Sequence, residues 1–116
     1  MSTRATLDTI TIFVKNEALR IFADRLKRVI LYGSYARGEN EEASDIDIML
    51  LLDISAEAIG KYRSEIAKVA SRLSLESDDC ITVSIALQDL ETFNKYKSVL
   101  PFYSNVDIEG VVVYAA

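Results

Sequence analysis

Two hydrophobic runs joined by a polar connection constrain the fold of this chain more than any other feature. The first run ends in Leu31-Tyr32-Gly33-Ser34, and the second starts at Ser44-Asp45-Ile46-Asp47 and continues to Leu52. Short runs rich in β-branched and aliphatic residues are typical of buried strands. We therefore predict two strands, residues 28–32 and 46–52, with a helical turn over 34–37 and an acidic connector over 39–43.

Hydrophobic periodicity predicts further helices and strands. Spacings of three and four indicate an amphipathic helix over residues 6–27 and a second one that Ser55 caps and that continues to Leu73. A polar turn follows over residues 74–79. Alternation with period two predicts a half-buried strand over residues 81–87. Its core-facing side chains would be Ile81, Val83, Ile85 and Leu87.

The C-terminal third is predicted to contain two helices and an edge strand. Residues 88–98 form the first helix, Pro101 opens a short second helix, and Gly110 ends it. Residues 111–114 then add an edge strand. The complete order predicts an α/β (α+β) fold, a small mixed sheet with helices packed on one face and the other face open. Residues 1–116 are expected to form a single domain, because a chain of this length supports one core.

Composition excludes several classes of function. The formal net charge of −5 argues against a nucleic-acid-binding surface, because phosphate contacts need clustered Lys and Arg. The chain contains no histidine, which excludes His-based catalysis and His-ligated zinc. The single cysteine, Cys80, fits a reducing compartment, and no apolar run is long enough to span a bilayer. We therefore expect a cytoplasmic protein without membrane contact.

Asp45 and Asp47 form a candidate metal site. Side chains alternate along a strand, so these two carboxylates project from the same face, about 7 Å apart at Cβ. Two carboxylates this close repel each other unless a cation compensates their charge. Mg²⁺ prefers oxygen ligands, and two carboxylates with triphosphate oxygens and water form a usual coordination set. A solvated Asp-x-Asp pair at a strand edge is the alternative interpretation of the same residues.

Gly33 and Ser34 form a candidate phosphate site at the end of the first strand. Glycine allows the backbone to approach a phosphate, and the serine hydroxyl can donate a hydrogen bond. Arg37, one turn further, either contacts a phosphate or balances the acidic residues of the connector. A simple turn remains the alternative interpretation of the Gly-Ser pair on its own.

The combination of these residues resembles a known family. Gly33-Ser34, ten intervening residues and Asp45-Ile46-Asp47 match the signature of the DNA polymerase β-like nucleotidyltransferase superfamily. The fuller strings, Gly33 to Gly38 and Ser44 to Asp47, resemble its minimal nucleotidyltransferase branch, which is little more than the catalytic core. The resemblance implies that Gly33, Ser34 and Arg37 bind the nucleotide and that Asp45 and Asp47 are catalytic Mg²⁺ ligands, with ATP as nucleotide donor.

The resemblance also implies a partner. Minimal nucleotidyltransferases are typically encoded beside a HEPN-domain protein, and many such pairs are toxin–antitoxin systems. The nucleotidyltransferase is then the antitoxin and transfers AMP from ATP to a tyrosine of the HEPN toxin. Active members of the family usually carry a third carboxylate on the later strand. Here that strand offers only Thr82 and Ser84 on its outer face, with Asp78 and Asp79 just before it.

Two hypotheses therefore remain, with the enzyme favoured. In the first, the chain is a Mg²⁺-dependent protein adenylyltransferase. In the second, it is a catalytically weakened module that neutralises the HEPN partner by direct binding. Transfer to a small molecule such as an aminoglycoside is a third option, but it needs an acceptor pocket that this short chain does not supply unless it dimerises. Met49 and Leu51 share the face of Asp45 and Asp47, so they are either an exposed patch for a partner or second copy, or covered by a helix of this chain.

Overall fold

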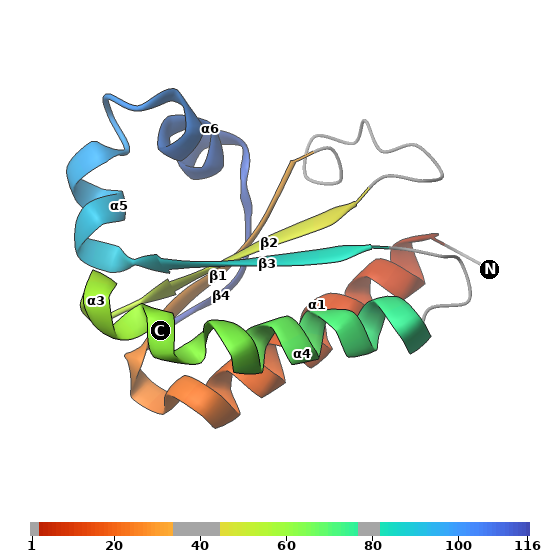
Figure 1. Ribbon diagram of the computed structural model, residues 1–116. Coiled ribbons are helices and arrows are strands. Elements are labelled where there is room, and N and C mark those ends of the chain that lie inside the picture. The colour runs from red at the N-terminus through yellow and green to blue at the C-terminus, as the bar shows by residue number, and fades with distance from the viewer. Residues whose placement is uncertain (1–2, 34–44, 77–81) are drawn as a thin grey trace.

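A mixed four-stranded sheet lies at the centre of the part of the chain that the computed structural model describes, residues 3–33, 45–76 and 82–116. Its strands are β1 (Leu26–Tyr32), β2 (Ile46–Leu52), β3 (Val83–Asp89) and β4 (Val111–Ala115). Their order is β3-β2-β1-β4 (Figure 1). β1 is antiparallel to β2 and β4, whereas β2 and β3 are parallel. The predicted α/β fold with a mixed sheet is confirmed, and so is the edge position of the last strand.

The helices follow the predicted order. They are α1 (Thr3–Phe22), α3 (Ala56–Ile59), α4 (Arg63–Glu76), α5 (Leu90–Tyr96) and α6 (Pro101–Glu109), with 3-10 turns at Ala23–Arg25 and Gly60–Tyr62. Among the described residues, no helix is both long and apolar enough to cross a membrane.

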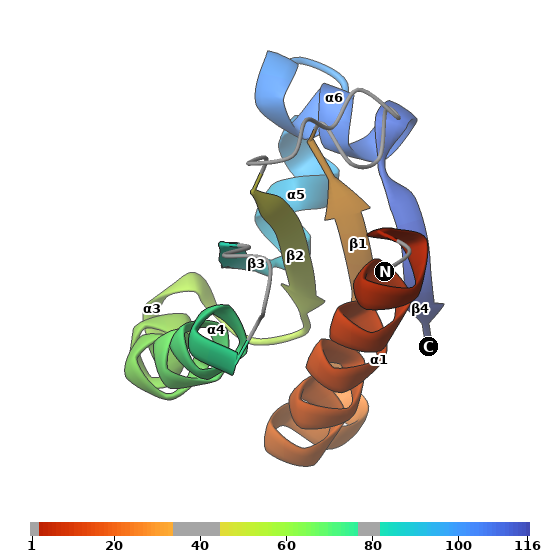
Figure 2. The same ribbon diagram turned by 90° about the vertical axis from the view of Figure 1, so that its right-hand side faces the viewer.

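The larger core lies between one face of the sheet and the helices α1, α3 and α4, and both views show α1 and α4 side by side on this face (Figures 1 and 2). Alternate residues of the strands point into it, as the period of two requires. Central members of this core are Val14, Phe22, Val29, Ile48, Leu50 and Ile66. Val83 and Leu87 are buried in it and Ile85 packs against it, which confirms the predicted inward positions on β3 within the described residues.

A smaller core on the opposite face corrects the expectation that helices pack on one face only. Met49 and Leu51 point to this face, where Phe93 of α5 and Val106 of α6 bury them completely or nearly so. β2 is apolar at almost every position, and a strand buried on both faces needs a second layer to cover it. Of the two interpretations of Met49 and Leu51, coverage by helices of the same chain is therefore confirmed.

Local signals place several element ends where the sequence predicts them. Ser55 caps α3, its Oγ accepting a hydrogen bond of 3.2 Å from the backbone nitrogen of Ala58. Pro101 stands at the start of α6 and Gly110 ends it. β2 has the predicted bounds, 46–52.

Other boundaries are corrected by pairing and capping. β3 ends at Asp89 and not at residue 87, because the parallel ladder with β2 continues from Ile46–Val83 to Leu52–Asp89. The following helix therefore begins at Leu90, and the Asp89 carboxylate caps it by accepting from the Thr92 nitrogen at 2.9 Å. α1 ends at Phe22, earlier than predicted, since Ala23 has a positive φ of 52°. The predicted polar turn at 74–79 is wrong for residues 74–76, which continue α4 to Glu76, while residues 77–79 and Ile81 lie outside the described residues.

Gly110→Ala is expected to destabilise the fold. A Cβ at Gly110 would meet the Val106 carbonyl oxygen and lie 2.5 Å from Ile30 Cγ2, so either α6 or β1 has to shift. Overpacking of this kind costs about 1–3 kcal/mol of unfolding free energy. Thermal or urea unfolding measures it. The matched control is Gly60→Ala, where nothing lies within 4 Å of the added Cβ. A Gly110→Ala protein as stable as the control would contradict the close packing of α6 on β1.

Candidate functional site

The candidate site is centred on the first residues of β2. Asp45 is exposed and directly precedes the strand, whereas Asp47 lies within it and is half-buried. Because Ile46 and Ile48 point into the larger core, the alternation places both carboxylates on the face of Met49, as predicted. α5 and α6 cover the middle of this face, and the aspartates lie at the end of the face where β2 begins.

Gly33 is packed directly against the carboxylate of Asp47. It follows β1 with a φ of +78°, a conformation that side chains rarely adopt. A Cβ at this position would lie 2.5 Å from Asp47 Oδ2 and 3.4 Å from its Cγ. The turn therefore brings bare backbone against the acidic group, and a glycine is required both by the conformation and by the space.

Tyr32 is a neighbour of both Gly33 and Asp47. It is opposite Asp47 in the β1–β2 ladder and immediately precedes Gly33. Burial raises the pKa of the Tyr32 hydroxyl above its ordinary value, and the negative charge of Asp47 raises it further. The phenol is therefore protonated at neutral pH and is available as a hydrogen-bond donor at the edge of the site.

The neighbouring strand places a serine beside Asp47. In the parallel β2–β3 register Asp47 is opposite Ser84, which is exposed, and the backbone nitrogen of Ile46 donates a 2.8 Å hydrogen bond to the Thr82 carbonyl. Strands pair at about 4.8 Å, so a carboxylate at position 84 would have reached the same site. No group of three or more His, Cys, Asp or Glu side chains able to hold a metal occurs among residues 3–33, 45–76 and 82–116.

The remaining predicted site residues lie outside the described part of the chain. They are Ser34 and Arg37, together with Asp78 and Asp79, the two acids just before β3. Of the five predicted site residues, the structure thus describes Gly33, Asp45 and Asp47, and it packs Gly33 against Asp47.

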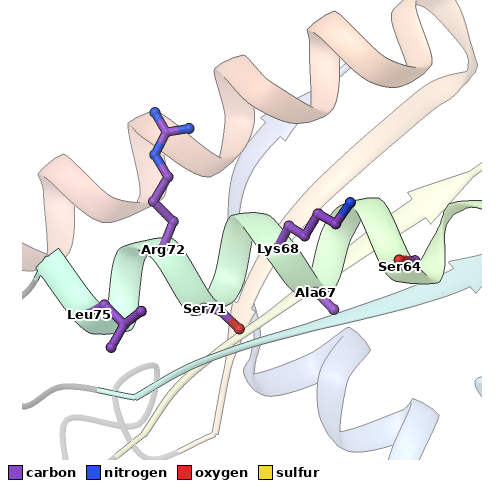
Figure 3. A pocket seen from close by; sticks show the side chains of 6 residues that line it. All are labelled: Ser64, Ala67, Lys68, Ser71, Arg72 and Leu75. Atoms are coloured by element: carbon purple, nitrogen blue, oxygen red, sulfur yellow. The ribbon is translucent and has the colours of Figure 1, made fainter.

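A surface hollow on α4 is separate from this site. It is lined by Ser64, Ala67, Lys68, Ser71, Arg72 and Leu75 (Figure 3). In this view Arg72 points toward α1, where its guanidinium lies 5.5 Å from the centre of the Phe13 ring. Because α4 packs on the sheet face opposite to Asp47, this hollow does not extend the candidate site.

One neighbour of the site was missed by reasoning from sequence. Phe102, in the first turn of α6, has its ring centroid 5.8 Å from that of Tyr32. Phe93 of α5, by comparison, is fully buried. Phe102, by contrast, remains 51% exposed. Residues 32 and 102 are far apart in the chain, and no periodicity could have paired them.

Known proteins that are similar to this chain belong to the kind of protein that the motif predicts. The model of the family described as "Nucleotidyltransferase domain" matches residues 14–107. A protein of Methanocaldococcus jannaschii named "Putative protein adenylyltransferase MJ0141" is 40% identical over 78 residues, which are 67% of this chain and 77% of that protein. A second from the same organism, "Putative protein adenylyltransferase MJ0604", is 33% identical over 93 residues, 80% of this chain and 83% of the relative.

Solved structures share the fold. A structure described as a "putative nucleotidyltransferase" from Sulfolobus solfataricus superposes with a TM-score of 0.56 at 17% identity, over 96% of this chain and 85% of that one. A crystal structure of a toxin–antitoxin with AMP-PNP superposes with a TM-score of 0.54 at 22% identity, over 89% of this chain and 72% of that one. The family match over residues 14–107, which contain the Gly-Ser and Asp-x-Asp elements, shows that the chain belongs to the nucleotidyltransferase domain family.

Proposed function

We propose that this chain is a Mg²⁺-dependent protein adenylyltransferase that transfers AMP from ATP to a tyrosine hydroxyl of a HEPN-domain toxin and thereby acts as its antitoxin. Two relatives carry the name of a protein adenylyltransferase, which supports a protein acceptor. The toxin–antitoxin structure with AMP-PNP supports a toxin partner and a nucleotide triphosphate donor. On this proposal residues 1–116 act as one nucleotidyltransferase domain in the cytoplasm.

The observation that carries the proposal is the contact of Gly33 with Asp47. A turn with a positive φ and no side chain allows the backbone at Gly33 to approach a phosphate beside two carboxylates. Asp45 and Asp47 supply hard oxygen ligands on one face, which is the donor set that Mg²⁺ prefers. The described residues therefore fit a metal–nucleotide complex.

Each residue then has a role. Asp45 and Asp47 would hold Mg²⁺, which when bound neutralises phosphate charge and polarises the phosphorus–oxygen bonds. The Gly33 turn, with Ser34 and Arg37, would bind the triphosphate and align it. The tyrosine oxygen attacks the α-phosphorus, the bond from this phosphorus to its bridging oxygen breaks, pyrophosphate leaves, and the phenolic proton passes to solvent.

Intact-mass analysis of the HEPN partner tests this function. The partner is incubated with this chain, ATP and Mg²⁺, and a mass increase of one or more AMP units is expected. The increase should vanish when the metal is chelated, because both carboxylates act through it. No increase under any of these conditions, with a stable complex on a sizing column, would overturn the enzymatic proposal.

Ser84 favours a second function, neutralisation by binding alone. The β3 position opposite Asp47 is where a third carboxylate would complete the site, but the residue there is Ser84. Its hydroxyl neither carries negative charge nor acts as a base at neutral pH. A weakened metal site reduces turnover more than it reduces binding. On this alternative the nucleotidyltransferase fold only occludes the active surface of the toxin.

Ser84→Asp distinguishes between a slow enzyme and a binding module. The new carboxylate would stand beside Asp47 and add a metal ligand and base, so we expect the initial rate of AMP transfer to rise by about 100-fold, the lower end of what a positioned base contributes. Ser84→Asn, which has similar size and no charge, is the control. An unchanged rate in Ser84→Asp would mean that this position does not limit turnover.

A further inference from the structure

A cluster of aromatic side chains lies beside the candidate site. Phe102 of α6 contacts Tyr32 edge to face, with ring centroids 5.8 Å apart and an interplanar angle of 86°. It also contacts Tyr103 at 5.6 Å, and Tyr103 in turn contacts the buried Phe93 at 5.8 Å. We call Tyr32, Phe102 and Tyr103 the aromatic platform. Figures 1 and 2 show the α6 helix beside the end of β1.

The platform is rigid on one side and open on the other. The Tyr103 hydroxyl donates a 3.1 Å hydrogen bond to Gln88 Oε1 of β3, and the Gln88 amide nitrogen donates to Asp89 Oδ1 at 3.0 Å. These contacts anchor the start of α6 to the sheet. Phe102 nevertheless remains 51% exposed, whereas Phe93 below it is fully buried. An aromatic side chain that is held in place and half exposed can stack with a flat partner.

The position of the platform relates it to the nucleotide. Tyr32 is opposite Asp47 in the sheet and is close enough for the Asp47 charge to raise the pKa of its hydroxyl. The platform thus begins one residue before Gly33, where the triphosphate would be bound. A nucleotide held by its phosphates at Gly33 and Asp47 has its base at the far end, and Phe102 lies one ring beyond Tyr32.

We propose that Phe102, supported by Tyr32 and Tyr103, is the stacking surface for the purine base of the bound nucleotide. The proposal rests on the proposed function, because it extends the same site from the phosphates to the base. Stacking on an aromatic face is tolerant of base identity, since every base has a π-face. The platform therefore contributes affinity and orientation, and ATP and GTP should depend on it to a similar degree.

Isothermal titration calorimetry with two probes separates the base from the phosphates. The probes are AMP-PNP and inorganic tripolyphosphate, each with Mg²⁺. Phe102→Ala is expected to weaken AMP-PNP binding by about 5- to 30-fold, the lower part of the range measured for loss of base stacking. The affinity for tripolyphosphate should not change. Ile108→Ala, on the same helix and 77% exposed, is the matched control and should leave both affinities unchanged.

Further variants separate stacking from packing. Phe102→Leu keeps an apolar contact with Tyr32 but removes the π-face, so it should lose AMP-PNP affinity as Phe102→Ala does, whereas Phe102→Tyr should retain it. Wild-type affinity in Phe102→Leu, or an equal loss for tripolyphosphate in Phe102→Ala, would overturn the proposal in favour of a structural role. Unchanged AMP-PNP affinity with lost binding of the toxin partner would overturn it in favour of a protein-docking role. A wild-type protein that binds neither probe would instead refute the proposed function itself.

Discussion

Replacing both aspartates, Asp45→Asn with Asp47→Asn, is expected to abolish AMP transfer while the protein still folds and binds its partner. The amides are nearly isosteric with the carboxylates, but they remove the two negative charges that would hold Mg²⁺ on this face. Loss of metal-derived charge stabilisation, worth several kcal/mol, corresponds to a rate decrease of at least about 100-fold. Relief of the repulsion between the two carboxylates should leave the free energy of unfolding unchanged or slightly higher.

The measurement combines initial rates of AMP transfer with sizing chromatography of the complex and a toxin-neutralisation assay in cells. Asp53→Asn is the matched control, because Asp53 is an exposed carboxylate just past the opposite end of β2. If transfer is required for neutralisation, the double variant fails to neutralise although the complex forms. A double variant that neutralises as well as the wild type would contradict the enzymatic mechanism and support direct binding.

Gly33→Ala is expected to have the second largest effect, and to reduce activity more than stability. The φ of +78° costs a side-chain-bearing residue about 1–2 kcal/mol of folding free energy. The new Cβ would also stand 2.5 Å from Asp47 Oδ2, so the carboxylate has to move. A displacement of about 1 Å at a reacting centre can reduce the rate about 100-fold.

Parallel measurements of unfolding and of AMP transfer test this expectation. Gly60→Ala again serves as control, because its backbone lies in the helical region and the space around it is open. The same Gly33→Ala protein should bind AMP-PNP more weakly if the turn holds the phosphates. A variant that lost stability but kept full activity would show that the turn has a structural role only.

The sequence by itself determined the local features of this protein. Gly33 and the pair Asp45 and Asp47 were identified from residue type and spacing, because strand alternation alone puts the two carboxylates on one face. β2 was predicted with the bounds that the structure shows, since every residue of it except Asp47 is apolar. The starts of two helices, at Ser55 and at Pro101, were also predictable, because the signals that start a helix depend on residues within one turn.

Tertiary structure alone decided how these features meet. The parallel register of β2 and β3 puts Ser84 opposite Asp47, and the continuation of that ladder moved the end of β3 to Asp89. The second layer, α5 and α6, covers a face that was expected to be open and brings Phe102 against Tyr32. Contacts of this kind join residues tens of positions apart, and they depend on the burial of whole faces and on strand pairing. Local pattern and propensity specify neither which strands pair nor which helix covers which face, so the carboxylates could be found in the sequence and their surroundings only in the fold.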